Sequence, residues 1–293
     1  MLCLIALAAV ICRGEAPAAA PSRPSKSRPS TSRASRDDAI RSIPFDKLDA
    51  ESRGKVNAVL EDVSLYRRLP TQVIRCDPAL YQFTIEHPDV TVDMWHVLDI
   101  SKVDLRRTGP GCFQMDDSEG VRAEIEYLHS GQDTHVIYST GAYSGPLFTR
   151  PVRGRCVMVL RSGFVRETNG EHYITSRLDT FIRVDHFGAE LIAKTFQPVV
   201  GKVIDHNFLE ATAFVSRLSR TAEVNAASTR SLTERLTQTR PEARQELISL
   251  LDRIGEKAGE RASAAKVHGP ISQAATARAD RSSRPSKVPS IRR

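Results

Sequence analysis

Arg177 and Asp179 are the charged residues of this chain whose spacing could support chemistry. They alternate with Phe181 on a predicted strand over residues 172–185, so the three side chains share one face of that strand. If this face lines a cavity, the two charges must pair with each other or with a ligand, because an unpaired charge away from water is costly. Exposure of this face to solvent is the simpler interpretation.

Patterns for metal binding and nucleophilic catalysis are weak in this sequence. Asp185-His186 and Asp205-His206 are adjacent pairs, and neighbouring residues point to different sides of a strand or helix. The segment Gly141 to Gly145 places its serine one position too late for the G-x-S-x-G turn of a hydrolase. We therefore predict no catalytic residue, no metal ligand and no cofactor, and an enzyme is the less favoured of the functions that stay open.

A long hairpin and a long helix are the elements that would position Arg177 and Asp179. Residues 152–165 and 172–185 alternate with period two around a Thr-Asn-Gly-Glu turn, and an apolar helical pattern covers residues 188–223. At about 3.3 Å per residue such strands reach roughly 45 Å, so the sheet has to curl. The helix, with a kink expected at Pro198, would fill the concave side.

The rest of the body reads as helices followed by short strands. Helical spacing predicts helices over residues 55–69, 77–87 and 88–98, where Trp95 is expected to be a core residue. Strand patterns over residues 102–185 predict an antiparallel meander of five or six strands, in which His135 is interpreted as a surface residue. The expected fold class is α+β, a curved antiparallel sheet gripping a long C-terminal helix, with extra N- and C-terminal helices.

This order of elements resembles the helix-grip fold of the START-like superfamily, which includes lipid-transfer domains, pollen-allergen-type carriers and polyketide cyclases. The resemblance covers about residues 101–223 and rests on the hairpin-to-helix junction, from Ser176-Arg177-Leu178-Asp179 to Thr195-Phe196. It implies that a hydrophobic small molecule or lipid binds between sheet and helix. The residues expected to line an apolar space of roughly several hundred Å³ are Phe181, Phe196, Val200 and Val203, with Arg177 and Asp179 beside it.

The two ends of the chain differ from its middle. Residues 1–20 resemble a secretory leader, because an apolar run from Met1 to Cys12 precedes an alanine-rich stretch. Residues 21–36 and 258–293 are rich in Pro, Ser, Ala and basic residues and are expected to be disordered, on either side of one folded domain at 37–257. The basic charge lies mostly on these ends, so an anionic envelope polymer or a membrane surface fits them, and a nucleic-acid site on the domain is not predicted.

Three classes of function remain open at this stage. The first is noncovalent binding of an apolar or amphipathic small molecule by an exported protein, located in the periplasm, the cell envelope or outside the cell. The second is a structural or interaction protein of the envelope that uses the basic tails and the helices over residues 225–257. The third is a START-like cyclase or hydrolase, which would need Arg177 and Asp179 inside the cavity. Cys76, Cys112 and Cys156 are expected to be buried thiols, with a Cys76 to Cys112 disulfide as the alternative.

Overall fold

The computed structural model describes residues 27–145, 150–185 and 197–268. The predicted leader, Phe196 and most of the basic tail lie outside these residues. The helices are α2 (Arg33–Arg41), the 3-10 helix η1 (Phe45–Lys47), α3 (Ala50–Leu60), α4 (Pro78–Glu86), α5 (Pro88–Val97), α7 (Gln197–Val224), α8 (Ala226–Glu234) and α9 (Pro241–His268). The strands are β1 (Leu65–Arg68), β2 (Gln72–Arg75), β3 (Asp104–Gly109), β4 (Cys112–Asp116), β5 (Val121–Ser130), β6 (Thr134–Tyr143), β7 (Val152–Arg166) and β8 (His172–Val184).

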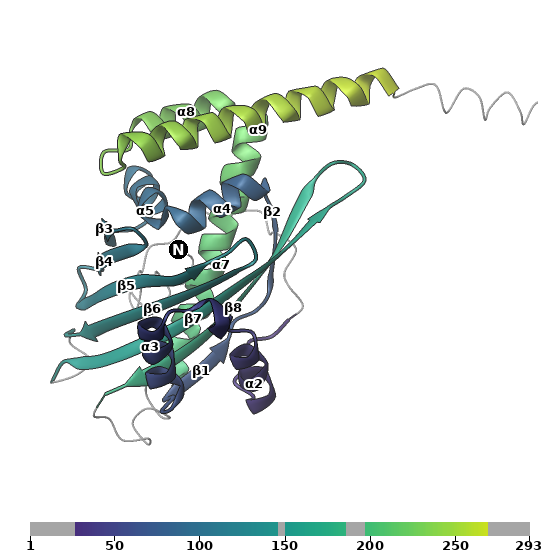
Figure 1. Ribbon diagram of the computed structural model, residues 1–293. Coiled ribbons are helices and arrows are strands. Elements are labelled where there is room, and N and C mark those ends of the chain that lie inside the picture. The colour runs from purple at the N-terminus through teal and green to yellow at the C-terminus, as the bar shows by residue number, and fades with distance from the viewer. Residues whose placement is uncertain (1–26, 146–149, 186–196, 269–293) are drawn as a thin grey trace, which may run out of the picture.

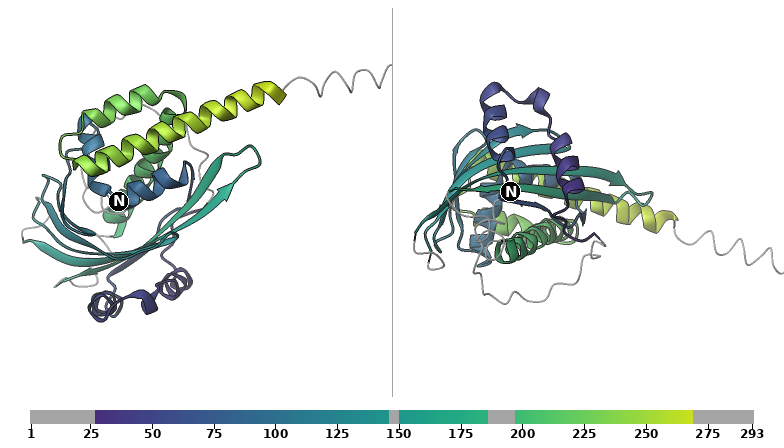
Figure 2. Two further views of the ribbon diagram at one scale, coloured as in Figure 1. Left: turned by 45° about the horizontal axis from the view of Figure 1, so that its top comes forward. Right: turned by 90° about the horizontal axis from the view of Figure 1, so that it is seen from below.

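All eight strands form one antiparallel sheet in the order β1-β8-β7-β6-β5-β4-β3, and β2 also pairs with β8. The sheet is strongly curled, as Figure 2 shows. Gly141 and Gly154 are paired across β6 and β7, where the backbones crowd together. A Cβ atom at Gly154 would come within 2.8 Å of the Arg183 carbonyl oxygen, so the curl at this point requires glycine.

The concave side of the sheet, which we call the inner face, holds α4, α5 and α7 (Figures 1 and 2). Helix α9 packs on α7 and α8 beyond this layer. The convex side, which we call the outer face, is covered in part by α2, η1 and α3 (Figure 2). The protein is therefore an α+β fold with helices on both sides of the sheet, and the expected fold class is confirmed.

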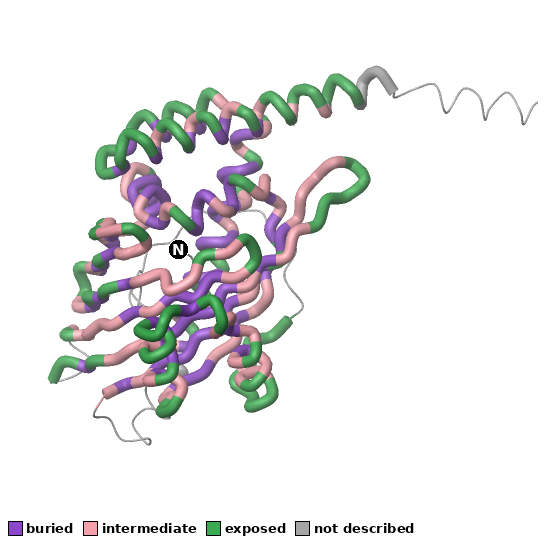
Figure 3. Tube along the Cα trace, in the orientation of Figure 1, coloured by how far each residue is buried: buried purple, intermediate pink, exposed green. Residues whose placement is uncertain are grey.

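Two clusters of buried apolar side chains correspond to these two faces. The larger one joins the inner face of the sheet to α4, α5, α7 and the C-terminal helices, and it contains Leu178 and Phe208. The smaller one lies between the outer face and α2, η1 and α3, and it contains Val157 and Phe181. Figure 3 shows the buried residues following the middle strands of the sheet. Strands β7 and β8 are thus buried on both sides, which is why they are rich in apolar residues.

The predicted helix over residues 55–69 is wrong in its second half. Helix α3 ends at Leu60, and β1 pairs with β8 from Leu65 opposite Ile182 to Arg68 opposite Asp179. Helical spacing failed here because both faces of β1 are covered, so Leu65 and Tyr66 are both buried and no alternation is visible.

The boundaries of the folded part extend further than expected at both ends. Helix α2 begins at Arg33, inside the segment predicted to be a linker, because Ser32 caps it by accepting a hydrogen bond from the backbone N–H of Ser35. The backbone of Ser30 also pairs with that of Arg68. At the other end α9 continues to His268, ten residues past the expected boundary at 258.

Helix α7 confirms the predicted long helix over the part of the pattern that is described. The helix is described from Gln197 onward, so Pro198 is its second described residue. The described residues therefore do not test the predicted kink at Pro198. The earlier part of the pattern, residues 188–196, lies outside the described residues.

Candidate ligand site between the sheet and the helices

The sequence-predicted residues do not gather at one place. Phe181 lies on the outer face, where its ring packs 5.1 Å from that of Tyr66, centroid to centroid. Val200 and Val203 are half-buried on α7, on the other side of the sheet, and Val200 contacts the larger cluster. Phe196 lies outside the described residues. Only Val200 and Val203 therefore belong to α7, the helix with which a sheet-to-helix site would be built.

Asp179 is fully buried, so the expectation that its face is exposed to solvent is wrong for this residue. Its carboxylate accepts hydrogen bonds from the Tyr66 hydroxyl and from Nε of Arg68, both at 2.7 Å. Arg161 lies 3.7 Å from the same carboxylate. Burial, together with the bond to Asp179, raises the pKa of Tyr66. Asp179 is thus held by fixed partners on the outer face and does not face α7.

Asp38 connects this buried network to helix α2. Its carboxylate pairs with Arg68 at 2.7 Å, with Arg161 at 3.2 Å and with Arg177 at 3.5 Å. The hydrogen bond from Arg68 holds the pKa of Asp38 below its ordinary value. Arg177 and Asp179 thus belong to the network of ion pairs that joins α2 to the outer face of the sheet.

Two charged contacts fix the ends of α7 on the inner face. Near its start, Arg67 of β1 donates two hydrogen bonds to the Asp205 carboxylate, one of them 2.7 Å from Nε. Near its end, Arg75 of β2 pairs with Glu223 at 2.8 Å. Between these contacts the helix places apolar side chains against the sheet, namely Ile204, Phe208, Ala211, Val215 and Leu218.

The inner face of the two long strands carries no charged side chain in its middle. Side chains alternate between the two faces of a strand. Every second residue of β7 from Val152 to Phe164 lies on the inner face, as does every second residue of β8 from Ile174 to Val184, and all of these residues are uncharged. Its polar groups include Ser162 and Ser176, whose hydroxyls lie 2.8 and 3.0 Å from the hydroxyl of Tyr81 on α4. These hydroxyls satisfy one another and tie α4 to the sheet.

His135, another polar residue of the inner face, differs from these hydroxyls in its hydrogen bonding. It lies on β6 directly opposite Leu160 of β7 and is fully buried. Neither ring nitrogen has a hydrogen-bond partner within the described part of the chain. Burial lowers the pKa of His135 to about 4, so the imidazole is neutral at neutral pH. A buried polar group left unpaired costs about 1–3 kcal/mol.

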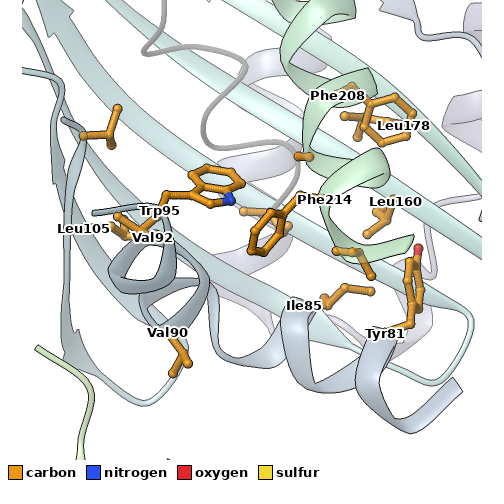
Figure 4. Close-up of a cluster of buried hydrophobic side chains, with 14 of the residues drawn as sticks. Tyr81, Ile85, Val90, Val92, Trp95, Leu105, Leu160, Leu178, Phe208 and Phe214 are labelled. Atoms are coloured by element: carbon orange, nitrogen blue, oxygen red, sulfur yellow. The ribbon is translucent and has the colours of Figure 1, made fainter. Parts of the chain in front are cut away.

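Trp95 of α5 belongs to the inner cluster and also carries a buried polar atom. Its ring stands edge-on to that of Phe214 of α7, with centroids 5.7 Å apart, and only 5% of the residue is exposed. Figure 4 shows Trp95 and Phe214 in the cluster that also contains Leu160 and Tyr81. The indole Nε1 has no hydrogen-bond acceptor among the described residues. The prediction that Trp95 is a core residue is confirmed.

The sequence contained a signal for His135 that the interpretation as a surface residue missed. His135 alternates with Val136 and shares its side of β6 with Ile137 and Ser139, both of which are buried. Because Val136 is buried as well, β6 has no exposed side at this point. A histidine directly before the apolar pair Val136-Ile137, on the same side of the strand as Ile137, could have been recognised as an inner-face group.

A hollow of about 630 Å³ lies at the end of the outer face, beyond α3, and is widely open. Thr140 and Ala142, which line it, continue the side of β6 that carries Val136. Exposed ion pairs such as Arg106 with Asp104 occur here. The hollow suits water and polar groups, in contrast to the apolar lining expected from the sequence. Its charged lining residues are Asp104, Arg106, Asp116, Arg122, Glu124, Arg153, Arg155 and Asp185.

The described residues contain no group of three or more His, Cys, Asp and Glu side chains that could hold a metal ion. The aspartates of the two adjacent Asp-His pairs have other partners: Asp205 accepts a hydrogen bond from Arg67, and Asp185 pairs with Arg155 at 3.3 Å. Cys76 and Cys112 both keep their thiols, so the alternative disulfide between them is not formed. Among the helices of the described ranges, none has the length and apolar character needed to cross a membrane.

No protein-family model matches the sequence, and no curated protein matches it. Solved structures do resemble the fold. They include a conserved protein from Geobacillus kaustophilus (TM-score 0.32, 10% identity, 49% of this chain and 92% of that chain) and Ara h 8.0201 (TM-score 0.30, 11% identity, 50% and 98%). A third is the di-domain ARO/CYC BexL from the BE-7585A biosynthetic pathway (TM-score 0.31, 17% identity, 62% and 60%). The similarity is low in each case and concerns the arrangement of the chain alone.

Proposed function

We propose that this protein binds an apolar or amphipathic small molecule noncovalently, between the inner face of the sheet and helices α4, α5 and α7, as a carrier of the START-like type. The observation that carries the proposal is the imidazole of His135, which is buried among apolar side chains with both nitrogens unpaired in the described chain. A bound molecule that supplied a partner would remove that cost.

The distribution of charge supports a carrier over an enzyme. The charged residues that an enzyme would need inside the cavity, Arg177 and Asp179, lie on the outer face with Asp38 and Arg68, and the inner face of β7 and β8 is uncharged in its middle. Acid–base chemistry on a ligand needs a titratable group within hydrogen-bond reach, and on the inner face His135 is such a group; its lowered pKa makes it a weak base that acts as a neutral hydrogen-bonding partner at neutral pH. An apolar lining with few polar groups is the usual composition of a site that only binds.

Binding of N-phenyl-1-naphthylamine, an uncharged probe that fluoresces in apolar surroundings, tests the proposal. Trp95 is the single tryptophan of the chain and belongs to the inner cluster, so energy transfer from Trp95 to the probe would locate the bound molecule there. We expect saturable probe binding with quenching of Trp95. Absence of saturable binding by the intact, folded protein would overturn the proposal.

Two matched variants then test on which face of the sheet the probe binds. Ala211 on α7 and Ala39 on α2 are both fully buried, one in the inner cluster and one in the outer cluster. Ala211→Leu adds volume on the inner side and should weaken probe binding by about tenfold or more, since each tenfold step corresponds to about 1.4 kcal/mol. Ala39→Leu adds the same volume on the outer side and should leave the affinity unchanged. The reverse result would place the ligand outside the inner face.

We also infer that the protein is exported, from the apolar run Met1 to Cys12 and the alanine-rich stretch that follows. Cell fractionation of the full chain, with mass spectrometry of its N-terminus, tests this inference. Recovery outside the cytoplasm, with the leader removed, is the expected result. Recovery of the uncleaved chain in the cytoplasm would contradict it.

A further inference from the structure

The open hollow at the end of the outer face carries opposite charges on its two sides. We propose that it binds a short zwitterion, a peptide of about three residues with free ends. The ammonium group of this ligand pairs with Glu124, and its carboxylate pairs with Arg153. The hollow lies on the other side of the sheet from the site proposed for an apolar ligand, so neither function depends on the other.

Small side chains on β6 form the floor of the hollow. Thr140 and Ala142 lie on the outer side of β6 and line the hollow. In the register of the sheet each of them has a charged residue beside it on both neighbouring strands. These residues are Arg122 and Arg153 beside Ala142, and Glu124 and Arg155 beside Thr140. Long side chains on both sides of short ones leave a trough along β6, which accounts for the hollow of about 630 Å³.

Most of the charged residues that line the hollow already have a partner. The pairs are Arg106 with Asp104 at 2.6 Å, Arg122 with Asp116 at 2.8 Å and Arg155 with Asp185 at 3.3 Å. The two remaining charged lining residues, Glu124 and Arg153, are exposed and form no ion pair within the described part of the chain. Glu124 belongs to β5 and Arg153 to β7, on different sides of the floor. The hollow therefore offers one free carboxylate and, across from it, one free guanidinium.

The separation of Glu124 and Arg153 sets the length of the ligand. Neighbouring strands are about 4.8 Å apart, so β5 and β7 are about 10 Å apart across β6. Glu124 is level with Thr140 and Arg153 with Ala142, which adds an offset of two residues, or about 7 Å, along the strands. The backbones at the two residues are therefore about 12 Å apart. An extended peptide covers about 3.3–3.6 Å per residue, so three residues span roughly 10 Å, and the two long side chains can lean over the floor to reach its ends.

The charges around the hollow are arranged at a cost to stability. Asp104 lies directly opposite Asp116, and Arg155 lies directly opposite Arg183. Like charges at directly opposite positions of a sheet are destabilising. Acidic residues outnumber basic ones among the lining residues of β3, β4 and β5, and basic residues outnumber acidic ones among those of β7 together with Asp185. Breaks in a rule of sheet stability are expected at functional sites, and this polarity matches a ligand with one charge at each end.

Titration of the ¹⁵N-labelled full chain with trialanine at pH 7, followed through the amide chemical shifts of Thr140 and Ala142, tests the proposal. We expect saturable shifts at both residues. N-acetyl-trialanine lacks the ammonium group and trialanine amide lacks the carboxylate, so each should bind about threefold or more weakly, as expected for the loss of one exposed ion pair. Equal affinity of the three peptides, or the absence of saturable shifts, would overturn the proposal. The shifts are read on the outer face, so the result does not depend on whether N-phenyl-1-naphthylamine binds.

Variants assign each end of the peptide to one residue. Glu124→Gln should bind trialanine and N-acetyl-trialanine equally well, and Arg153→Gln should bind trialanine and its amide equally well, because each variant has lost the partner of the group that the blocked peptide lacks. Ala142→Phe fills the floor with a residue suited to a strand and should abolish the shift at Thr140. Glu119→Gln and Arg166→Gln are the matched controls, since both residues are exposed and neither lines the hollow. Continued discrimination against N-acetyl-trialanine by Glu124→Gln, or against the amide by Arg153→Gln, would overturn the assignment.

Discussion

Leu178 and Phe181, three residues apart on β8, pack into two different hydrophobic clusters on opposite faces of the sheet. Leu178 faces helix α7, and Phe181 faces α2, η1 and α3 together with Asp179. The charged side chains of β8 and its uncharged inner side chains therefore lie on opposite faces of the sheet. The ion pairs of Asp179 belong to the outer side, where they hold a helix, and the inner side of β7 and β8 is uncharged in its middle.

The ion pairs of Asp179 on the outer face should contribute strongly to the free energy of unfolding. Asp179→Ala leaves Arg68 and Arg161 without their buried counterion, and breaking a buried pair in this way costs about 3–5 kcal/mol. Urea denaturation measures this change in the free energy of unfolding. Asp62→Ala is the control, because Asp62 is 73% exposed and pairs loosely with Arg183 at 3.6 Å. Its effect should be within about 0.5 kcal/mol. Equal effects of the two variants would contradict the structural role given to Asp179.

Much of the fold could be predicted from the sequence, and the site could not. The hairpin was predicted at residues 152–165 and 172–185, and β7 and β8 lie within a residue of those limits, because the Asn169-Gly170 turn and the alternation are local signals. Which face of β8 meets α7 is not a local property. Both faces are buried, so alternation separates Leu178 from Phe181 without saying which of them lies inward.

The short strands β1 and β2 were missed for a related reason. Each has only four residues, and each is a strand because it pairs with β8, a partner about a hundred residues away in the chain. Local propensity has little weight when a distant partner supplies the backbone hydrogen bonds. The cap of α2 is different, since Ser32 precedes the helix in the pattern expected of an N-cap and could have been recognised.

His135→Phe should stabilise the unliganded protein, because it removes a buried polar group that has no partner in the described chain. The variant should also lose less of its free energy of unfolding than the parent protein when the pH is lowered. The folded-state pKa of about 4 lies below the ordinary value of 6.5, so the unfolded chain binds the proton first and stability falls as the pH drops from 6.5 toward 4. The parent protein should lose about 2 kcal/mol between pH 7.5 and pH 5 through this residue alone.

Unfolding of the two proteins in urea at both pH values measures the His135 effect. Among the described residues, His129 and Asp133 are titratable neighbours of His135, and both are retained in the variant, so they contribute equally to the two curves. His206→Phe on the exposed side of α7 is the control and should leave the acid sensitivity unchanged. Loss of stability in His135→Phe at pH 7.5 would show that the imidazole has a structural partner and does not await a ligand.

Arg67 and Asp205 should be strongly coupled, because they join β1 to the start of α7 by two charge-assisted hydrogen bonds and are each less than one-fifth exposed. A double-mutant cycle with Arg67→Ala and Asp205→Ala should give a coupling energy of about 1–3 kcal/mol. The pair Arg217 and Glu210 on the same helix is the control, since both side chains are about half exposed and lie 3.9 Å apart. Its coupling should be below about 0.5 kcal/mol. Similar coupling in both pairs would contradict the role of Arg67 in holding α7.

The start of the folded domain can be tested by two truncations. A chain that begins at residue 27 keeps Ser30, which pairs with Arg68, and Ser32, which caps α2; a chain that begins at Asp37, the boundary expected from composition, lacks both. Loss of the cap and of the first turn of α2 should lower the free energy of unfolding by about 1–2 kcal/mol. The loss should be smaller when Asp38→Asn is present in both chains, because α2 is then already weakly held to Arg68 and Arg161. Equal stability of the two truncated chains would show that residues 27–36 contribute nothing to the domain.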